Sequence, residues 1–404
     1  MKNGWPIRIL ADVCEVFADG DWVESKDQSP EGIRLIQTGN VGEGVFKDRV
    51  DKARYISEAT FKRLRCTEIF EGDCLISRLP DPVGRSCLLP DTGERMITAV
   101  DCTIVRLNSK QLLPEFFNFY SQSLDYLKAV DAETSGTTRN RISRSKLGQV
   151  GIPVPTLPEQ QRIVGILDEA FQGIATAEAN AEKNLQNARA LFESHLQSVF
   201  TQHGEGWTER RLGEVFDIGS SKRIRETEWT SSGVPFYGGK EIVRLAKFGS
   251  AFSDAYISEQ KYRDYASKYD MPRKGDILIT ARGTIGVGYV VKEDDKFYYK
   301  DGNIISFREK TPTNPFFVLY AFRSNRLIEQ FADLTGATVK HLPIERAKDL
   351  ILKMPSFAAQ NSVVEHLGNI ESETQRLAKL YERKLAVLEA LKKSLLHQAF
   401  TGEL

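Results

Sequence analysis

The sequence lacks the features that mark membrane, secreted and metal-binding proteins. It has no apolar run of about 18 residues, which a membrane-spanning helix needs, and no signal-peptide pattern after its first methionine. Its five cysteines form no C-x-x-C pair, and none of its five histidines lies near a cysteine in sequence. We therefore expect reduced thiols in a cytoplasmic protein, with neither disulfides nor a metal site.

Motifs for catalysis and nucleotide binding are also missing. There is no P-loop pattern, and Gly283–Gly288 joins two predicted strands, whereas a dinucleotide-binding loop leads into a helix. Asn314–Phe317 lacks the second proline of an amino-methyltransferase loop, and a helix cap followed by proline explains it. Asp294–Lys296 fits a solvated turn better than a nuclease site. The sequence thus predicts no catalytic residue.

Charge of one sign is not in excess, because 55 basic residues balance 55 acidic ones. The total charge therefore gives no support to nucleic-acid binding. The distribution is less even, since residues 134–158 contain no acid and four basic residues, Arg139, Arg141, Arg144 and Lys146. Such a patch suits docking to phosphates at one place, although a solvated surface has the same composition.

What the sequence does contain is a long helical stretch near its centre. Pro158 and Glu159 suit a first helical turn, and neither proline nor glycine interrupts the chain from Ile174 to Gln202. Apolar or aromatic residues recur there at steps of three and four, as in a helix packed along another helix. These residues are Leu185, Ala188, Phe192, His195 and Val199. A helix of about 40 residues would be about 60 Å long.

The same pattern returns about 200 residues later. Met354-Pro355 corresponds to Val154-Pro155, Gln360 to Gln160, and Phe400-Thr401 to Phe200-Thr201. The second stretch has a fuller apolar stripe, namely Leu367, Ile370, Leu377, Tyr381, Leu388, Leu391 and Leu395. Two long helices with matching stripes most simply pack against each other. The alternative is that each is an amphipathic helix on its own domain.

The sequence before each helix is duplicated as well. Gly275–Thr280 matches Gly72–Ser77, Phe316-Phe317 lies 200 residues beyond Phe116-Phe117, and Thr335–Lys340 corresponds to Ser135–Asn140. Each copy alternates short strand-like pieces with turns and then a helix. The predicted order is globular unit, helix, globular unit, helix, over residues 1–151, 152–203, 204–351 and 352–404.

Together these residues resemble the specificity subunit of type I restriction–modification systems. The resemblance rests on Ile152–Ile163, Lys393–Leu404, Gly336–Leu342 and the paired Gly-Asp-x-Leu-Ile strands. It implies an α+β fold with two globular target-recognition domains of small twisted β-sheets plus helices. These would be separated by two long antiparallel coiled-coil helices.

The resemblance implies a non-catalytic reader of double-stranded DNA. Each recognition domain would bind one half of a bipartite asymmetric site, while the helices set the spacing and dock two methyltransferase subunits. Those partners would methylate adenine with S-adenosylmethionine, and restriction/translocase subunits would use ATP and Mg. The chain itself is expected to bind no cofactor.

Base-reading side chains should lie in loops, with Arg pairing to guanine and Asn or Gln to adenine, although each candidate could equally meet phosphate or hold structure. Candidates in the first domain are Gln37, Thr38, Asn40, Arg78, Arg85, Arg139, Asn140 and Arg141. Candidates in the second are Tyr237, Lys240, Arg282, Thr284, Lys340 and His341. Candidates for partner contact are Glu159, Gln160, Arg162, Gln360, Phe200 and Phe400.

The two copies differ in ways that bear on function. The loop after Ser77 is longer than the loop after Thr280, and most other loops differ too, which predicts two unlike half-sites. Two further hypotheses stay open at this point. One is a helical protein-interaction scaffold that reads no DNA, and the other is a self-contained methyltransferase or nuclease.

Overall fold

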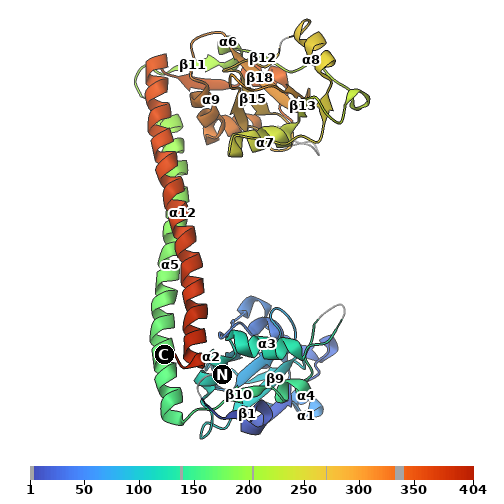
Figure 1. Ribbon diagram of the computed structural model, residues 1–404, viewed down its shortest axis with the longest axis vertical. Coiled ribbons are helices and arrows are strands. Elements are labelled where there is room, and N and C mark those ends of the chain that lie inside the picture. Colours follow the sequence, from blue (N-terminus) through green and yellow to red (C-terminus); the bar gives the residue numbers. More distant parts are fainter. Residues whose placement is uncertain (1–3, 137–139, 203, 270, 333–340) are drawn as a thin grey trace. The chain divides into compact units, whose positions relative to one another are not determined.

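The structure is a computed structural model that describes residues 4–136, 140–202, 204–269, 271–332 and 341–404. The chain divides into two compact units (Figure 1). Unit 1 comprises Met1–Glu182 and Arg383–Leu404, and unit 2 comprises Lys183–Glu382. Each unit therefore holds one globular lobe, the start of one long helix and the end of the other. We call the globular parts lobe 1, before Leu157, and lobe 2, between Gln202 and Phe357.

Among the residues that the structure describes, lobe 1 contains three small sheets and four short α-helices. The first sheet is antiparallel, in the order β2 (Cys14–Asp19), β9 (Cys102–Leu107), β6 (Cys74–Ser77), β7 (Ser86–Leu88). The second has the order β3 (Gln28–Ser29), β5 (Tyr55–Ile56), β4 (Ile33–Ile36), β8 (Met96–Thr98). The third pairs β1 (Ile7–Ile9) with β10 (Gly151–Pro153). The helices are α1 (Glu58–Leu64), α2 (Pro114–Tyr120), α3 (Leu124–Ala132) and α4 (Arg144–Gly148).

Lobe 2 repeats this plan. One sheet has the order β12 (Phe216–Gly219), β18 (Ile304–Glu309), β15 (Ile277–Thr280), β16 (Gly288–Val290). Another has the order β14 (Tyr256–Ile257), β13 (Val234–Tyr237), β17 (Tyr298–Tyr299), and β11 (Thr208–Arg211) pairs with β19 (Ile351–Met354). The helices are α6 (Leu212–Val215), α7 (Gly239–Phe248), α8 (Glu259–Ala266), α9 (Pro315–Phe322), α10 (Asn325–Ala332) and α11 (Ile344–Asp349).

The same local devices build both lobes. Asp73 accepts a hydrogen bond from the Phe70 amide and pairs with Arg106 at 2.7 Å, and Asp276 pairs with Arg308 at 2.6 Å. The strands β4 and β13 each follow a glycine with positive φ, Gly32 (+125°) and Gly233 (+128°). An added Cβ there would collide with the carbonyl oxygen of the neighbouring strand, so both positions require glycine. The predicted duplication is thus visible in side-chain contacts.

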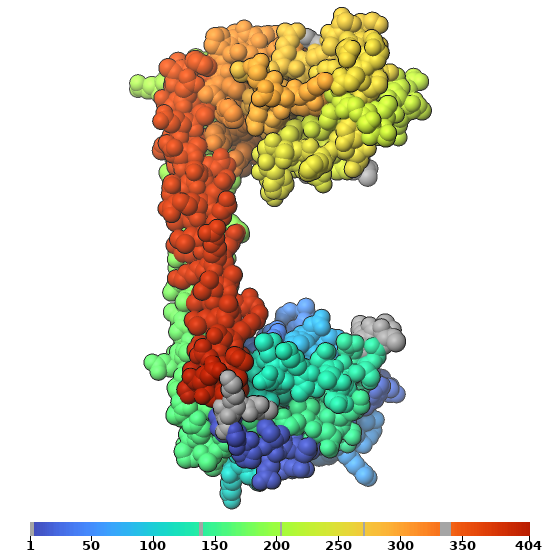
Figure 2. All heavy atoms as spheres, in the orientation of Figure 1, coloured from blue at the N-terminus to red at the C-terminus, as the bar shows by residue number. Residues whose placement is uncertain are grey.

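The long helices are α5 (Leu157–Gln202) and α12 (Phe357–Thr401), and they pack against each other in both units. In unit 1 the end of α12 lies beside the start of α5 (Figure 2). Lys392 of α12 pairs there with Glu178 of α5 at 2.6 Å. In unit 2 the end of α5 lies beside the start of α12, and His195 contacts His366 with ring centroids 6.2 Å apart. The helices are therefore antiparallel, and the alternative of two helices on separate domains is wrong. The α+β fold class is as predicted.

The structure gives the spacing of the predicted repeat at one helix start and the cap of that helix. Helix α2 begins with Pro114 and α9 with Pro315, so the spacing here is 201 residues and Phe317 occupies the place of Phe116. Asn314 caps α9 through its side-chain oxygen, which accepts from the Phe316 amide at 2.9 Å. The cap explains the Asn-Pro sequence, as expected. The matched segment Thr335–Lys340 lies outside the described residues.

Within the described ranges no helix is both long and apolar enough to cross a lipid bilayer. All five cysteines are free thiols. Burial raises the pKa of Cys14 and Cys87 to about 12 and that of Cys102 to about 11, so these thiols stay protonated near neutral pH.

Candidate nucleic-acid interface

Three loops that carry predicted DNA-contacting residues meet at one edge of lobe 1. The Arg85 guanidinium joins two of them, because its Nη2 donates to the Thr38 carbonyl at 2.9 Å and its Nη1 to the Leu79 carbonyl at 2.7 Å. The third loop is attached where the Ile142 amide donates to the Arg78 carbonyl at 3.3 Å. Residues that are widely spaced in the sequence therefore form one surface.

Charged side chains of both signs pair with each other at this surface. Arg78 pairs with Asp19 at 3.3 Å, and Arg144 approaches the same carboxylate at 3.7 Å. Arg141 pairs with Asp101 at 3.0 Å and remains half exposed. Arg141 also pairs with Ser135 through two backbone hydrogen bonds, of 2.9 and 3.0 Å, which fix the base of its loop. Arg141 is therefore held by both its backbone and its side chain at the rim of lobe 1.

The structure gives three of the lobe 1 candidates an internal role instead of an exposed one. Arg78 is 4% exposed, and its Nη2 donates to the Val100 carbonyl at 2.5 Å. Arg85 is half-buried, and its Nε, Nη1 and Nη2 all donate to backbone carbonyls. Asn40 is buried, accepts from the Gln37 amide at 3.0 Å and donates to the Lys47 carbonyl at 2.9 Å. These groups hydrogen-bond within the lobe and hold the shape of its loops.

The remaining lobe 1 candidates do reach the surface. Asn140 and Arg141 are exposed, and Gln37 and Thr38 are partly exposed. Arg139 lies outside the described residues. Whether the exposed side chains contact bases or phosphates stays a prediction.

Lobe 2 brings its candidates together through an equivalent contact. Arg282 and His341 form an isolated antiparallel bridge, and the Leu342 amide donates to the Ala281 carbonyl at 2.8 Å. Arg282 and Thr284 are exposed, and His341 is partly exposed. Lys340 lies outside the described residues.

Two other lobe 2 candidates have partners within the protein. Tyr237 is buried against Phe297, with ring centroids 4.8 Å apart, and its hydroxyl donates to the Ala251 carbonyl at 3.4 Å. Burial also raises the pKa of Tyr237. Its proposed role as a DNA contact is therefore replaced by a packing role. Lys240 is exposed, with Asp254 at 3.9 Å.

Four residues proposed for partner contact are also internal. Gln160 is 0% exposed, and its Oε1 accepts from the Leu113 amide at 2.8 Å while its Nε2 donates to the Gln111 and Pro155 carbonyls. Gln360 is 3% exposed and makes matching bonds to the Asn314 amide and the Pro355 carbonyl. Phe200 and Phe400 are each 1% exposed in the lobe cores. These four side chains fasten helices to lobes and are not available to a partner.

Glu159 and Arg162 remain accessible at the start of α5. They pair at 2.8 Å, and this hydrogen bond lowers the pKa of the Glu159 carboxyl. Arg162 also donates to the Leu404 carbonyl at 3.0 Å. Contact of these two residues with a partner stays a prediction.

Comparison with known proteins identifies the family. The model described as "Type I restriction modification DNA specificity domain" matches residues 2–186 and 204–383. The chain belongs to this family. A putative type I restriction enzyme specificity subunit of Haemophilus influenzae is 30% identical over 279 residues, which cover 67% of this chain and 68% of that protein.

Two solved structures share the fold. A chain from a study of complex assembly and conformational transition of the type I R-M system superimposes with a TM-score of 0.76 at 19% sequence identity. The match covers 100% of this chain and 99% of that chain. The HsdS subunit from Thermoanaerobacter tengcongensis gives a TM-score of 0.64 at 19% sequence identity. The match covers 100% of this chain and 98% of that subunit.

The chain is thus a non-catalytic specificity subunit that recognises DNA sequence. Its two matched segments contain lobe 1 and lobe 2, an arrangement consistent with bipartite recognition. The family rules out the scaffold that reads no DNA and the self-contained enzyme.

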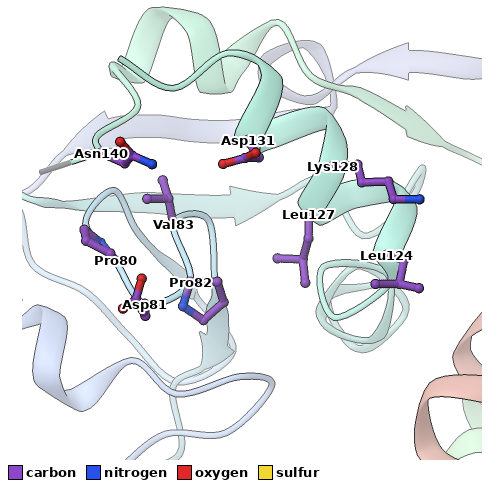
Figure 3. A pocket seen from close by; sticks show the side chains of 9 residues that line it. All are labelled: Pro80, Asp81, Pro82, Val83, Leu124, Leu127, Lys128, Asp131 and Asn140. Atoms are coloured by element: carbon purple, nitrogen blue, oxygen red, sulfur yellow. The ribbon is translucent and has the colours of Figure 1, made fainter. Parts of the chain in front are cut away.

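Two cavities of lobe 1 border the candidate loops of this specificity subunit. One, of about 540 Å³, lies between Pro80–Val83 and α3 with Asn140 at its rim, and Asp81, Lys128 and Asp131 give it mixed charge (Figure 3). The other, of about 480 Å³, is lined by Gln37, Asn40, Arg49, Lys52, Ala53 and Arg54.

Sequence reasoning missed the three cations of the second cavity. Arg49, Lys52 and Arg54 are interspersed with Asp48 and Asp51, so the segment looks like an ordinary solvated turn. The one usable signal was their closeness in sequence to the predicted loop at Gln37.

Proposed function

We propose that each lobe of this specificity subunit reads one half of a bipartite, asymmetric DNA site. The observation that carries this proposal is the recurrence of one loop arrangement with different exposed side chains. Lobe 1 presents Asn140 and Arg141 beside the end of β6, and lobe 2 presents Arg282 and His341 beside the end of β15. Equivalent placement supports the same task for both lobes. Different donors and acceptors support different base sequences.

The proposal assigns direct reading to the exposed polar side chains. Arg141 and Arg282 can each make a two-pronged contact with guanine, and Asn140 with adenine. The ion pair with Asp101 limits the positions that the Arg141 side chain adopts. A restrained arginine loses less side-chain freedom when it meets a base, which favours a specific contact over a diffuse one.

We further propose that α5 and α12 set the distance between half-sites and dock two methyltransferase subunits. Half-sites read from one face of a duplex lie about one helical turn apart, roughly 34 Å. A helix of 46 residues, as α5 is, would be about 70 Å long. Gln160 and Gln360 attach the two long helices to their lobes through matching hydrogen bonds. The start of each helix therefore has a similar local structure, which suits the docking of two copies of one partner.

The two docking surfaces would still differ in strength. The accessible Glu159 and Arg162 of α5 correspond to Ala359 and Ser362 of α12. Native mass spectrometry of the chain with its co-expressed methyltransferase should show two partner copies, and Glu159→Ala with Arg162→Ala should weaken one of them. A complex with a single copy, or an unchanged double variant, would contradict this assignment.

The chain is proposed to bind no cofactor, since the methyltransferase and restriction subunits would hold S-adenosylmethionine, ATP and Mg. Calorimetry of the lone chain with S-adenosylmethionine should give no binding heat. Saturable binding would contradict the proposal.

The direct test of the bipartite assignment is an exchange of residues 1–151 for those of a relative with a different methylation site. Mapping of methylated adenines in the host should then show one altered half-site and one unchanged. Alteration of both halves would contradict the assignment of one half to each lobe.

A further inference from the structure

The cavity beside Gln37 in lobe 1 has an unusual charge. Its side-chain lining holds two amides, one alanine and three cations, Arg49, Lys52 and Arg54. No acidic residue lines it. Other arginines nearby are neutralised, because Arg34 pairs with Asp48 and Glu94, and Arg95 pairs with Glu58 and Glu68.

The three cations have no such partners. Among the described residues none forms an ion pair or a hydrogen bond with the side chain of Arg49, Lys52 or Arg54. The acid that precedes Arg49, Asp48, is already engaged by Arg34. Like charges around one cavity repel each other, so an anion that enters it relieves this repulsion.

The cavity is also built by the surrounding backbone. Gly39 allows the Arg49 guanidinium to lie against the loop, since an added Cβ would collide with its Nη1. Asn40 forms a fixed wall, because its carboxamide is bonded to the Gln37 amide and the Lys47 carbonyl. Arg49 is only partly exposed, whereas Lys52 and Arg54 are exposed.

Lobe 2 has a cavity at the equivalent place, with a different charge. The register of Ile33 with Ile56 repeats in Val234 with Ile257, so Asn40 corresponds to Glu241. Glu241 accepts from the Gly238 amide at 2.9 Å, just as Asn40 accepts from Gln37. By the same register, Ala53 of lobe 1 corresponds to Asp254 of lobe 2, and Arg54 corresponds to Ala255.

The two cavities therefore differ in net charge. The lobe 2 cavity, of about 270 Å³, is lined by two lysines, Lys240 and Lys300, and two acids, Glu241 and Asp254. Its cations and acids balance, whereas the lobe 1 cavity carries three cations and no acid. The two cavities occupy equivalent places in the duplicated fold, but only the lobe 1 cavity has the positive charge that an anion site needs.

We propose that the lobe 1 cavity, here called the phosphate pocket, binds a phosphate of the DNA backbone next to the half-site that lobe 1 reads. Guanidinium and ammonium groups bind phosphate oxygens with short, charge-assisted hydrogen bonds. Contacts of this kind fix the position of a protein on a duplex and carry no sequence information. This inference rests on the proposed function, because the pocket adjoins the loop of Gln37 and Thr38.

The test measures DNA affinity of the full-length chain over a series of salt concentrations. The variant combines Arg49→Ala, Lys52→Ala and Arg54→Ala. A matched control combines Lys26→Ala, Lys62→Ala and Lys110→Ala, which removes three exposed cations of the same lobe outside the pocket. The charge-preserving set Arg49→Lys, Lys52→Arg and Arg54→Lys separates loss of charge from loss of packing.

The pocket variant should bind about tenfold or more weakly near 0.15 M salt. The slope of log affinity against log salt should become shallower by about one, the change expected for the loss of one phosphate contact. Affinity should fall equally for the methylation site and for a random duplex, and the methylated sequence should stay the same. The control and charge-preserving variants should keep the parental slope.

An unchanged slope in the pocket variant, with normal thermal unfolding, would overturn the phosphate pocket. If the parental chain bound no DNA, the proposed function itself would fail, so the two failures are distinguishable. Calorimetry with inorganic phosphate separates the sources of the anion. Tight binding of free phosphate that the pocket variant abolishes, with DNA affinity unchanged, would contradict the backbone assignment.

Discussion

Gln160 and Gln360 share two side-chain hydrogen bonds, which recur in the two units. Each accepts from the backbone amide at the start of a short helix, that of Leu113 before α2 or that of Asn314 before α9. Each donates to the carbonyl of the proline five residues before it, Pro155 or Pro355. Each long helix is thus fastened at its first turn to the lobe that precedes it.

The C-terminal end of each long helix packs on a lobe through an equivalent phenylalanine. Phe400, near the end of α12, packs on Phe116 and Tyr120 of lobe 1, with ring centroids 5.4 and 5.1 Å away. Phe200, near the end of α5, packs on Phe317 of lobe 2 at 5.3 Å. Each lobe therefore receives the start of one helix and the end of the other.

Gln160→Ala should destabilise the chain by about 2–4 kcal/mol, because it leaves the part-buried Leu113 amide and the buried Pro155 carbonyl without their side-chain partner. Gln360→Ala should behave similarly. The control is Gln161→Ala, an exposed neighbour, which should stay within about 0.5 kcal/mol of the parent. Urea unfolding followed by circular dichroism measures the difference. An unchanged free energy of unfolding in Gln160→Ala would contradict the structural role of this side chain.

Arg85→Ala and Arg141→Ala should separate structure from reading. Loss of Arg85 removes the donor of four part-buried hydrogen bonds to backbone carbonyls and should cost about 2–3 kcal/mol of stability. Loss of the half-exposed Arg141 should change stability by less than about 1 kcal/mol, since its ion pair is partly solvated. It should nevertheless relax one position of the methylation site. Thermal unfolding and methylation mapping of both variants check the contrast.

Asp73→Ala and Asp276→Ala should have similar costs in the two lobes. Each removes the partner of a half-buried arginine and an acceptor that closes a turn before β6 or β15. We expect about 2–4 kcal/mol for each, less than for a fully buried pair because Arg106 and Arg308 retain some solvent contact. A cost confined to one lobe would contradict their equivalence. Urea unfolding measures both.

The buried thiols should give stability a dependence on alkaline pH. Burial raises the pKa of Cys87 from 9.0 to about 12 and that of Cys102 to about 11. Their contribution is fully present below pH 9, and it is lost as pH rises through these values, because the unfolded chain then releases the protons first. Native protein should react slowly with a thiol reagent at pH 8, and denatured protein at once. Rapid native labelling of Cys87 would contradict its burial.

The sequence was sufficient to predict the duplicated order and the helix pair. The spacing of apolar residues, the proline and acid at the first turn, and the second copy all constrain the helices independently. Periodicity has a physical cause, since one stripe of each helix must leave water. The lobes were harder to predict, because their strands are two to six residues long and carry little periodicity.

The site was only partly predictable because burial is invisible in sequence. Gln160 and Arg85 are polar residues in suggestive segments, and both turned out to satisfy backbone groups inside the fold. Arg49, Lys52 and Arg54 escaped notice for the opposite reason. Their neighbouring acid Asp48 pairs with Arg34, 14 residues earlier, so the local sequence hides a cavity without acids.

The most direct test of one half-site per lobe is methylation mapping of two single variants, Arg141→Ala and Arg282→Ala. Both arginines are exposed, so neither substitution should unfold its lobe. Each variant should relax a base in a different half of the site and leave the other half and the spacing unchanged. Relaxation of the same half by both variants, or no change in either, would contradict the reading of one half-site by each lobe.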